Sequence, residues 1–209
     1  MITDVCIFAK DSDTSVRRFA LNAASCKFNR IIVSGQTGDD TLSAYAGVEI
    51  LRGTVIPAES KNFNESLKKA RGTMVLVEAG ENSFNRTAVT AKNVRFLTGL
   101  WALPKHSFDD VIARSMAARN VAAVFDLSKI IDARSRRHAL HHYAEVLKFA
   151  RKFGFPCAIA SGASSWLGQR SVQEAAALCS LFGMERAEVY KALDVDSVLF
   201  PREAVEVIE

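Results

Sequence analysis

Short apolar runs alternate along the chain with longer segments in which apolar residues recur at helical spacing. Several runs, such as IIV and MVLV, are continuously apolar, which is typical of strands covered on both faces rather than of strands with one wet face. The pattern predicts a largely parallel sheet with helices packed against it. The predicted strands are residues 3–9, 30–34, 48–51, 73–79, 94–97, 121–127, 157–161 and 197–200.

The helical segments between these runs carry their own end signals. Ser107 opens one segment, and we predict it as the N-cap. A long segment that starts near Arg136 ends at Gly154, a residue suited to the left-handed conformation that follows a helix C-terminus. The next segment opens with Ser171 and Glu174, in the spacing of a capping box.

Eight strands that alternate with helices favour parallel pairing with right-handed crossovers. We therefore predict an α/β fold of the TIM-barrel-like (β/α)8 type or a slightly irregular barrel. Seven strands would fit nearly as well as eight, and an open doubly wound sheet is the alternative. No linker or repeat divides the sequence, so residues 1–209 are expected to form a single barrel domain. In both architectures, function belongs at the carboxyl ends of the strands.

Composition limits the class of protein. The chain is 49% apolar and 24% charged, and it holds no apolar run near the roughly twenty residues that a membrane helix needs. The N-terminus does not read as a secretory signal. Its cysteines lack C-x-x-C spacing, which favours free thiols in a reducing compartment. We expect a cytoplasmic protein that does not bind a membrane, with free thiols at Cys6, Cys26, Cys157 and Cys179.

The net charge of +4 is mild, but its distribution is uneven. Residues 129–170 hold eight basic and two acidic side chains, whereas residues 171–209 hold three basic and eight acidic ones. A local basic stretch suits an anionic partner such as nucleic acid. A solvated helix face is the alternative explanation.

Three arginines, Arg134, Arg136 and Arg137, lie at or just before a helix start, where positive charge opposes the helix dipole. A helix selected only for stability would carry acidic residues there. An anionic partner would explain the conflict, and Lys148, Arg151 and Lys152 further along the same segment extend the basic face.

The stretch IASGASSWLGQRSVQE lies just after a predicted buried strand and therefore at a strand carboxyl end. Gly162 is expected to permit a tight turn there. Arg170 comes immediately before a helix N-terminus that itself favours anions. Trp166 has two explanations: an exposed ring that stacks on a base or fills a protein interface, or a lid that packs on neighbouring helices.

Two residue sets suggest metal chemistry. Asp11, Glu78 and Asp126 follow three strands and offer a magnesium site, although each carboxylate is as well explained by a helix cap or an arginine pair. His138, His141 and His142 share one helix face, but no H-E-x-x-H accompanies them. The first strand also lacks the His-x-His of barrel metallohydrolases. We therefore predict no metal site in the chain.

The run from 106 to 183 resembles the archaeal ribonuclease P protein component 3 family, the counterpart of the eukaryotic thirty-kilodalton ribonuclease P subunit. Three segments carry the resemblance in order: FDDVIARSMAARN leading into VAAVFDLSKII, then DARSRRHAL opening a helix that ends in KFGFP, then AIASGA followed by QRS and a helix. The family often has proline after the Arg-Ser, whereas this chain has Val172.

The resemblance implies a barrel related to metal-dependent phosphoesterases but without their metal ligands. It also implies a protein subunit of ribonuclease P, the particle that removes the 5′ leader from precursor tRNA. The expected partners are the ribonuclease P RNA, precursor tRNA within the particle, and ribonuclease P protein component 2. The chain itself is then expected to be non-catalytic and to need no cofactor, because the RNA carries the active site with its Mg²⁺.

Together, these observations predict that the residues contacting RNA are Arg134, Arg136, Arg137, Lys152, Trp166 and Arg170. Two other functions remain open at this point. One is a stand-alone magnesium-dependent phosphoesterase that uses Asp11, Glu78 and Asp126. The other is a structural adaptor whose basic stretch is incidental.

Overall fold

The computed structural model describes residues 1–8, 15–35, 42–58, 60 and 62–201. Seven parallel strands form one sheet in the order β1-β2-β4-β5-β6-β7-β8, and β3 pairs antiparallel with β4. Seven of the predicted strands are therefore confirmed, while β3 was not predicted. The strands are β1 (Thr3–Phe8), β2 (Arg30–Ser34), β3 (Ala44–Tyr45), β4 (Val48–Ile56), β5 (Met74–Glu78), β6 (Val94–Thr98), β7 (Ala122–Asp126) and β8 (Cys157–Ala160).

The two ends of this strand order meet, so the sheet closes into a barrel. Ile7 forms a parallel bridge with Ala163, whose carbonyl accepts the N–H of Phe8 at 2.9 Å. The N–H of Gly162 donates to the carbonyl of Cys6 at 3.1 Å. These bonds lie at the carboxyl end of β1, where the barrel is therefore sealed. The prediction of an irregular barrel is confirmed, and the open doubly wound sheet is wrong.

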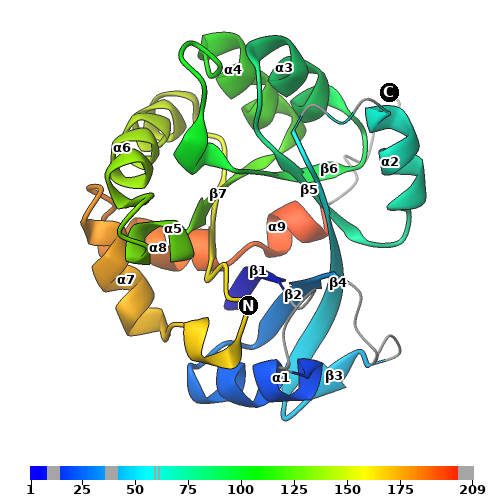
Figure 1. Ribbon diagram of the computed structural model, residues 1–209, viewed down its shortest axis with the longest axis vertical. Coiled ribbons are helices and arrows are strands. Elements are labelled where there is room, and N and C mark those ends of the chain that lie inside the picture. The colour runs from blue at the N-terminus through cyan, green and yellow to red at the C-terminus, as the bar shows by residue number, and fades with distance from the viewer. Residues whose placement is uncertain (9–14, 36–41, 59, 61, 202–209) are drawn as a thin grey trace, which may run out of the picture.

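The helices surround the strands (Figure 1). Most connect one strand to the next and cover the outer face of the sheet, which explains why so many strand residues are buried on both sides. They are α1 (Val16–Ser25), α2 (Phe63–Lys69), α3 (Asn82–Thr90), η1 (Leu100–Ala102), α4 (Asp110–Arg119), α5 (Ser128–Ile131), α6 (Arg136–Phe153), η2 (Trp166–Gly168), α7 (Val172–Ser180), α8 (Arg186–Leu193) and α9 (Asp196–Leu199).

The prediction of an eighth strand at residues 197–200 is wrong. This run forms the short helix α9, which lies in the middle of the ring of helices in Figure 1. Val198 and Leu199 are buried against strand residues such as Leu76 and Phe96. An apolar run of four residues fits a buried helix turn as well as a strand, so the pattern alone did not decide between them.

Two apolar cores result from this arrangement. The larger core lies between the sheet and the surrounding helices and includes Phe19, Phe125 and Tyr143. The smaller core fills the barrel and is completed at one end by α9. At that end, the buried Arg30 pairs with Glu49 at 2.7 Å and with Asp196 of α9, so the charge of its guanidinium is balanced.

The predicted helix ends are partly confirmed. Gly154 follows α6 with φ +76°, and Ser171 and Glu174 form the capping box of α7. The N-cap of α4 is Asp109, whose side chain accepts the N–H groups of Val111 and Ile112, so the prediction of Ser107 is wrong. A carboxylate at this position both accepts these bonds and complements the helix dipole.

Candidate nucleic-acid interface

The connection from β8 to α7 begins with a tight turn at the barrel rim. Gly162 has φ +61°, and a Cβ atom at this position would lie 2.0 Å from Oδ1 of Asp126. Only glycine allows the backbone to approach the end of β7 so closely. The prediction that Gly162 permits a tight turn is therefore confirmed.

Asp126 supports this turn from the end of β7. Its Oδ1 accepts the backbone N–H of Ser128 at 2.9 Å and the hydroxyl of Ser128 at 2.6 Å. Burial raises the pKa of Asp126, while the bonds from Ser128 oppose that rise. Through these bonds, the carboxylate of Asp126 stabilises the connection from β7 to α5.

Trp166 packs on α1 and is half-buried. The guanidinium carbon of Arg18 lies 4.3 Å from the centre of its ring, and the carbonyl of Trp166 accepts Nδ2 of Asn22 at 3.1 Å. The ring is thus held by a neighbouring helix and also reaches the surface. The packing agrees with the second explanation, and contact of Trp166 with a base or a protein partner stays a prediction.

Arg170 is half-buried at the end of the same connection. Its Nη1 donates to the carbonyls of Leu167 and Gln169, each at 2.9 Å. It forms no ion pair with a carboxylate of the described residues, and Asp126 bonds to Ser128 instead. Arg170 therefore carries its positive charge next to the N-terminus of α7, close enough to the carboxylate of Glu174 to interact with it electrostatically.

The three arginines before and within the first turn of α6 have different surroundings. Arg136 donates to the carbonyls of Ile130 and Ile131, each at 2.8 Å, and so caps the C-terminal end of α5. The backbone N–H of Arg134 binds Asp132 and lowers the pKa of that carboxyl. Within the described residues, the exposed side chain of Arg137 has no hydrogen bond or ion pair.

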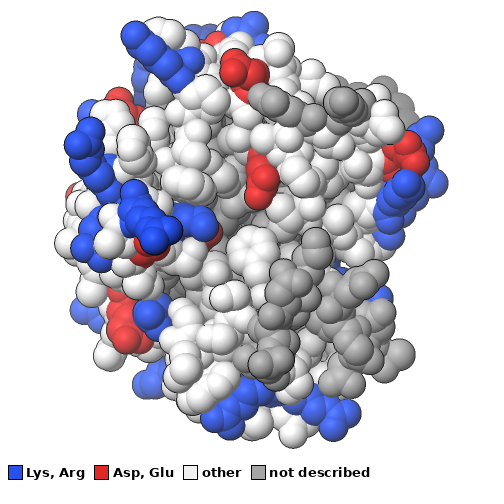
Figure 2. Space-filling view, in the orientation of Figure 1, with Lys and Arg blue, Asp and Glu red and all other residues white. Residues whose placement is uncertain are grey.

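Arg136 thus resolves part of the conflict predicted at this helix start, because its charge faces carbonyl oxygens. The other two arginines remain exposed, and Figure 2 shows basic side chains along the left side of the molecule, over α5 and α6. The start of α6 therefore presents a cationic surface on which not every arginine is paired with an acidic residue of the described chain.

Further along α6, the basic residues have acidic neighbours. Lys152 pairs with Asp110 of α4 at 3.1 Å, and Lys148 pairs with Glu145 at 2.7 Å. Arg151 forms two hydrogen bonds of 2.8 Å with Glu188 of α8. Exposed pairs of this kind contribute little to stability and exchange readily, so Lys152 stays accessible to an anion.

The acidic C-terminal region is largely used inside the chain. Glu174 caps α7, Glu188 binds Arg151, and Asp194 and Asp196 both pair with the amino group of Met1. These carboxylates therefore balance charges of the same molecule. Glu203, Glu206 and Glu209 lie outside the described residues.

The metal candidates do not assemble into a site within the part of the chain that the structure describes. There, no three His, Cys, Asp or Glu side chains are placed to hold an ion. Glu78 and Asp126 end two strands, and Asp11 lies outside the described residues. His138 and His142 stack with ring centres 6.5 Å apart, and burial lowers the pKa of His142. The described residues thus do not fit a metal ion, and the absence of metal stays a prediction.

The barrel interior also holds a buried carboxyl that sequence reasoning missed. Asp4 accepts the N–H of Ser161 at 2.8 Å, while its Oδ2 has no hydrogen-bond partner. Burial raises the pKa of Asp4 from 3.8 to about 6, against the lowering effect of the bonds from Ser161. This carboxyl lies next to the sealing contact between β1 and β8.

Sequence reasoning also missed the basic residues at the start of α1. Arg17 and Arg18 lie in its first turn, which holds no acidic residue. This is the same conflict with the helix dipole that drew attention to the start of α6, so the same signal would have found them. Arg17 lies over the ring of Tyr45 at 5.8 Å, as Arg18 lies over Trp166.

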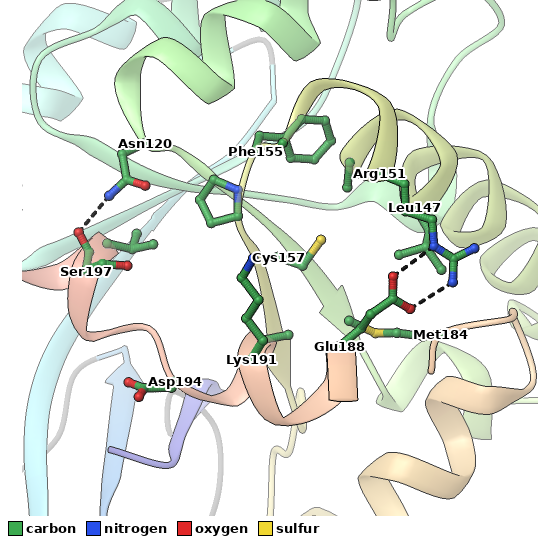
Figure 3. Close-up of a pocket in the computed structure, with 15 residues that line it drawn as sticks. Asn120, Leu147, Arg151, Phe155, Cys157, Met184, Glu188, Lys191, Asp194 and Ser197 are labelled. Carbon is green, nitrogen blue, oxygen red and sulfur yellow. Dashed lines mark hydrogen bonds and ion pairs between the residues drawn. The ribbon is translucent and has the colours of Figure 1, made fainter. Parts of the chain in front are cut away.

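A pocket of about 460 Å³ lies elsewhere, among α6, α8, α9 and the start of β8 (Figure 3). Apolar residues such as Phe155 and Met184 line it, and the Arg151–Glu188 pair lies on one wall. Because β8 starts here, the pocket lies at the amino end of that strand. None of the six residues predicted to contact RNA lines it.

All four cysteines are free, as predicted. Burial raises the pKa of Cys157 and of Cys179 to about 12, so both thiols stay protonated and unreactive at neutral pH. Of the helices among the described residues, none has the length and apolar character needed to cross a bilayer.

The fold and this rim define a class: parallel α/β barrels with helices around the sheet and a cationic surface near the strand carboxyl ends. A chain in the cryo-EM structure of archaeal ribonuclease P with mature tRNA has this fold, with a TM-score of 0.69 and 19% identity over 99% of this chain and 98% of that one. A histidinol phosphate phosphatase from Lactococcus lactis, crystallised with zinc, also shares the fold, with a TM-score of 0.60 and 12% identity over 88% of this chain and 94% of that one.

Within that class, the chain belongs to the RNase P subunit p30 family, whose model matches residues 1–204. A ribonuclease P protein component 3 from Methanococcoides burtonii is 35% identical over 57% of this chain and 51% of that protein. The same component from Methanothermobacter thermautotrophicus is 32% identical over 69% of this chain and 62% of that protein. The matches thus span between half and two thirds of the length of these two relatives.

Proposed function

We propose that this chain is a protein subunit of ribonuclease P and supports the catalytic RNA in removing the 5′ leader from precursor tRNA. The observation that carries the proposal is the match to the p30 family over residues 1–204. The barrel shared with a chain of archaeal ribonuclease P and the basic helix start at Arg134 and Arg137 support it.

In this role, the chain binds RNA and performs no bond cleavage. The RNA supplies the active site and its Mg²⁺, so the chain needs no cofactor of its own. Arg134, Arg137, Lys152 and Arg170 neutralise phosphates, and Trp166 contributes an aromatic face. Arg136 contacts RNA only with the part of its guanidinium that does not cap α5.

The proposal includes two further expectations. The protein partner is ribonuclease P protein component 2, and the pair supports the catalytic domain of the RNA. The particle acts in the cytoplasm, in line with four free cysteines. Component 2 contacts loops and helices, because a closed barrel leaves its main strands without a free edge for pairing.

Reconstitution tests the proposal. Precursor tRNA cleavage is measured with the ribonuclease P RNA and its other protein components, with and without this chain. We expect the chain to raise the cleavage rate and the chain alone to cleave nothing at any Mg²⁺ concentration. The proposal is wrong if the chain does not join the particle, or if it hydrolyses RNA or a phosphomonoester by itself, as the phosphoesterase alternative requires.

A salt series separates RNA binding from an incidental basic surface. The affinity for the ribonuclease P RNA should fall steeply with salt, because each phosphate contact releases counterions. The variant Arg134→Gln/Arg137→Gln should reduce the slope of log affinity against log salt by about two. The matched control is Arg86→Gln, which removes an exposed arginine paired with Asp109 and should leave the slope unchanged.

A further inference from the structure

The first turn of α1 and the η2 turn meet at a mixed cationic and aromatic surface. Arg18 lies over the ring of Trp166 with its guanidinium carbon 4.3 Å from the ring centre. Arg170 binds the carbonyls of Leu167 and Gln169 in the same turn. We call the surface formed by Arg18, Trp166 and Arg170 the rim platform.

The rim platform is fixed by contacts beneath it. Nδ2 of Asn22 donates to the carbonyl of Trp166 at 3.1 Å and to Oε1 of Gln169 at 3.0 Å. Gln169 is buried, so the η2 turn is tied to the middle of α1 by a sheltered amide pair. The turn that carries Trp166 and leads to Arg170 is therefore fixed before any ligand arrives, which lowers the entropy lost on binding.

The charge of the rim platform is not explained by folding. The first turn of α1 holds Arg17 and Arg18 and no acidic residue. Arg18 forms no ion pair with a described residue, and its side chain is exposed. Positive charge at a helix start raises the energy of the free protein, and a bound anion would relieve that cost.

The ring of Trp166 indicates which kind of anionic ligand fits the rim platform. Leu167 is 67% exposed next to Trp166, so the turn offers apolar surface as well as charge. A phosphate ion alone would use the arginines and leave the ring without a role. An unpaired nucleotide uses both, because its base stacks on aromatic and guanidinium planes while its phosphates bind the arginines.

We propose that the rim platform binds an unpaired nucleotide of the ribonuclease P RNA, with the base stacked on Trp166 and Arg18 and the adjacent phosphates bound by Arg18 and Arg170. This inference rests on the proposed function and assigns a place and a mode to part of it. Figure 2 shows basic side chains gathered at the lower edge of the molecule, over α1, apart from those over α5 and α6. The RNA therefore contacts at least two cationic surfaces.

Fluorescence of a single tryptophan tests the stacking. Trp101→Phe leaves Trp166 as the only tryptophan of the chain. Titration of the full-length variant with the ribonuclease P RNA should quench the Trp166 emission, and the signal should saturate at the stoichiometry measured by filter binding. Binding without quenching overturns the stacking assignment.

Substitutions test the arginine of the stack. Arg18→Gln should weaken RNA binding about tenfold, since it removes a phosphate contact and part of the stack. Arg18→Lys should recover only part of the affinity, because an ammonium keeps the charge but lacks the plane. The control is Arg186→Gln, which breaks a similar exposed pair with Tyr190 on α8 and should leave the affinity unchanged.

The results separate this inference from the proposed function. If the chain binds the RNA with a steep salt dependence but Arg18→Gln binds like the parent, the rim platform is not an RNA site and the proposed function stands. If Arg18→Gln loses affinity for component 2 instead, the platform is a protein interface and the inference is wrong. If the chain binds no RNA and joins no particle, both fail. Melting temperatures of all variants show whether each one is folded.

Discussion

At the residue scale, the carboxyl that is buried most deeply among the described residues has one oxygen without a hydrogen-bond partner there. Asp4 is held by Ser161, and burial raises its pKa to about 6. Its folded-state pKa lies above the unfolded value of 3.8, so the native state binds the proton more tightly. The contribution of Asp4 to stability is therefore favourable at acidic pH and is lost as pH rises through about 6.

Asp4→Asn should remove this dependence. Asparagine resembles the protonated acid, so parent and variant should have similar unfolding free energies near pH 4. By pH 7, the variant should have gained roughly 2–3 kcal/mol relative to the parent. Urea unfolding across this pH range measures the difference. A difference that stays constant with pH would show that Asp4 titrates as it does in the unfolded chain.

Arg170 is half-buried, and its guanidinium forms local hydrogen bonds. Its two bonds to backbone carbonyls lie within its own turn, and no carboxylate among the described residues pairs with it. An arginine at this position could instead pair with a strand-end carboxylate such as Asp126. The guanidinium of Arg170 bonds to the carbonyls of Leu167 and Gln169 and forms no ion pair with Asp126.

Arg170→Ala should weaken the affinity for the ribonuclease P RNA by about 1.5–3 kcal/mol, which is typical of a lost charge-assisted contact. The melting temperature should fall only slightly, because the capping box of α7 and the buried strand β8 remain. Arg170→Lys serves as the control, because lysine keeps the positive charge but lacks the planar guanidinium that forms two parallel hydrogen bonds. A clear drop in melting temperature with normal RNA affinity would contradict the RNA-facing assignment.

At the element scale, the connection from β8 to α7 depends on the absence of a side chain. Gly162 and Gly154 both have positive φ, +61° and +76°, so alanine is strained at either position. They differ in their surroundings: a Cβ at Gly162 would collide with Asp126, whereas nothing lies within 4 Å of a Cβ at Gly154.

Gly162→Ala should therefore destabilise the protein more than Gly154→Ala does. The control variant should cost about 1 kcal/mol from backbone strain alone. Gly162→Ala should cost at least about 2 kcal/mol more, because Asp126 must move and its bonds to Ser128 break. Urea unfolding of both variants measures the gap, and equal losses would mean that the turn relaxes without disturbing β7.

Most strands could be predicted from the sequence, whereas the short strand β3 and the contacts of α1 could not. Seven strands were predictable because each is a run rich in apolar residues, and a helical segment follows all of them except β2. The hairpin arm β3 was not, since two residues form no pattern, and Ala46 and Gly47 turn the chain with positive φ. The arginines at the start of α6 were found by their conflict with the helix dipole, and the same conflict at Arg18 was overlooked. The contact of Arg18 with Trp166 could not be predicted, because the two residues lie far apart in sequence.

At the scale of the whole molecule, the two ends of the barrel have different roles. The strand carboxyl ends hold the rim platform and the turn at Gly162, while α9 completes the core at the opposite end. Helix α9 is anchored there by the pair between Arg30 and Asp196, a contact that joins residues 166 positions apart. Such a distant partner explains why the run 197–200 was misread as a strand.

This division of roles predicts opposite effects of two substitutions. Leu199→Ala removes a buried side chain of α9 from the barrel core and should cost about 2–5 kcal/mol of stability. At a temperature where the variant is folded, its affinity for the ribonuclease P RNA should equal that of the parent, because the rim is intact. Arg18→Gln should do the reverse, with weaker RNA binding and an almost unchanged melting temperature. Leu181→Ala, at a leucine that is 59% exposed, is the control and should change neither quantity. If Leu199→Ala weakens RNA binding in its folded state, the core end and the rim are coupled, and the separation of stability from binding along the barrel axis is wrong.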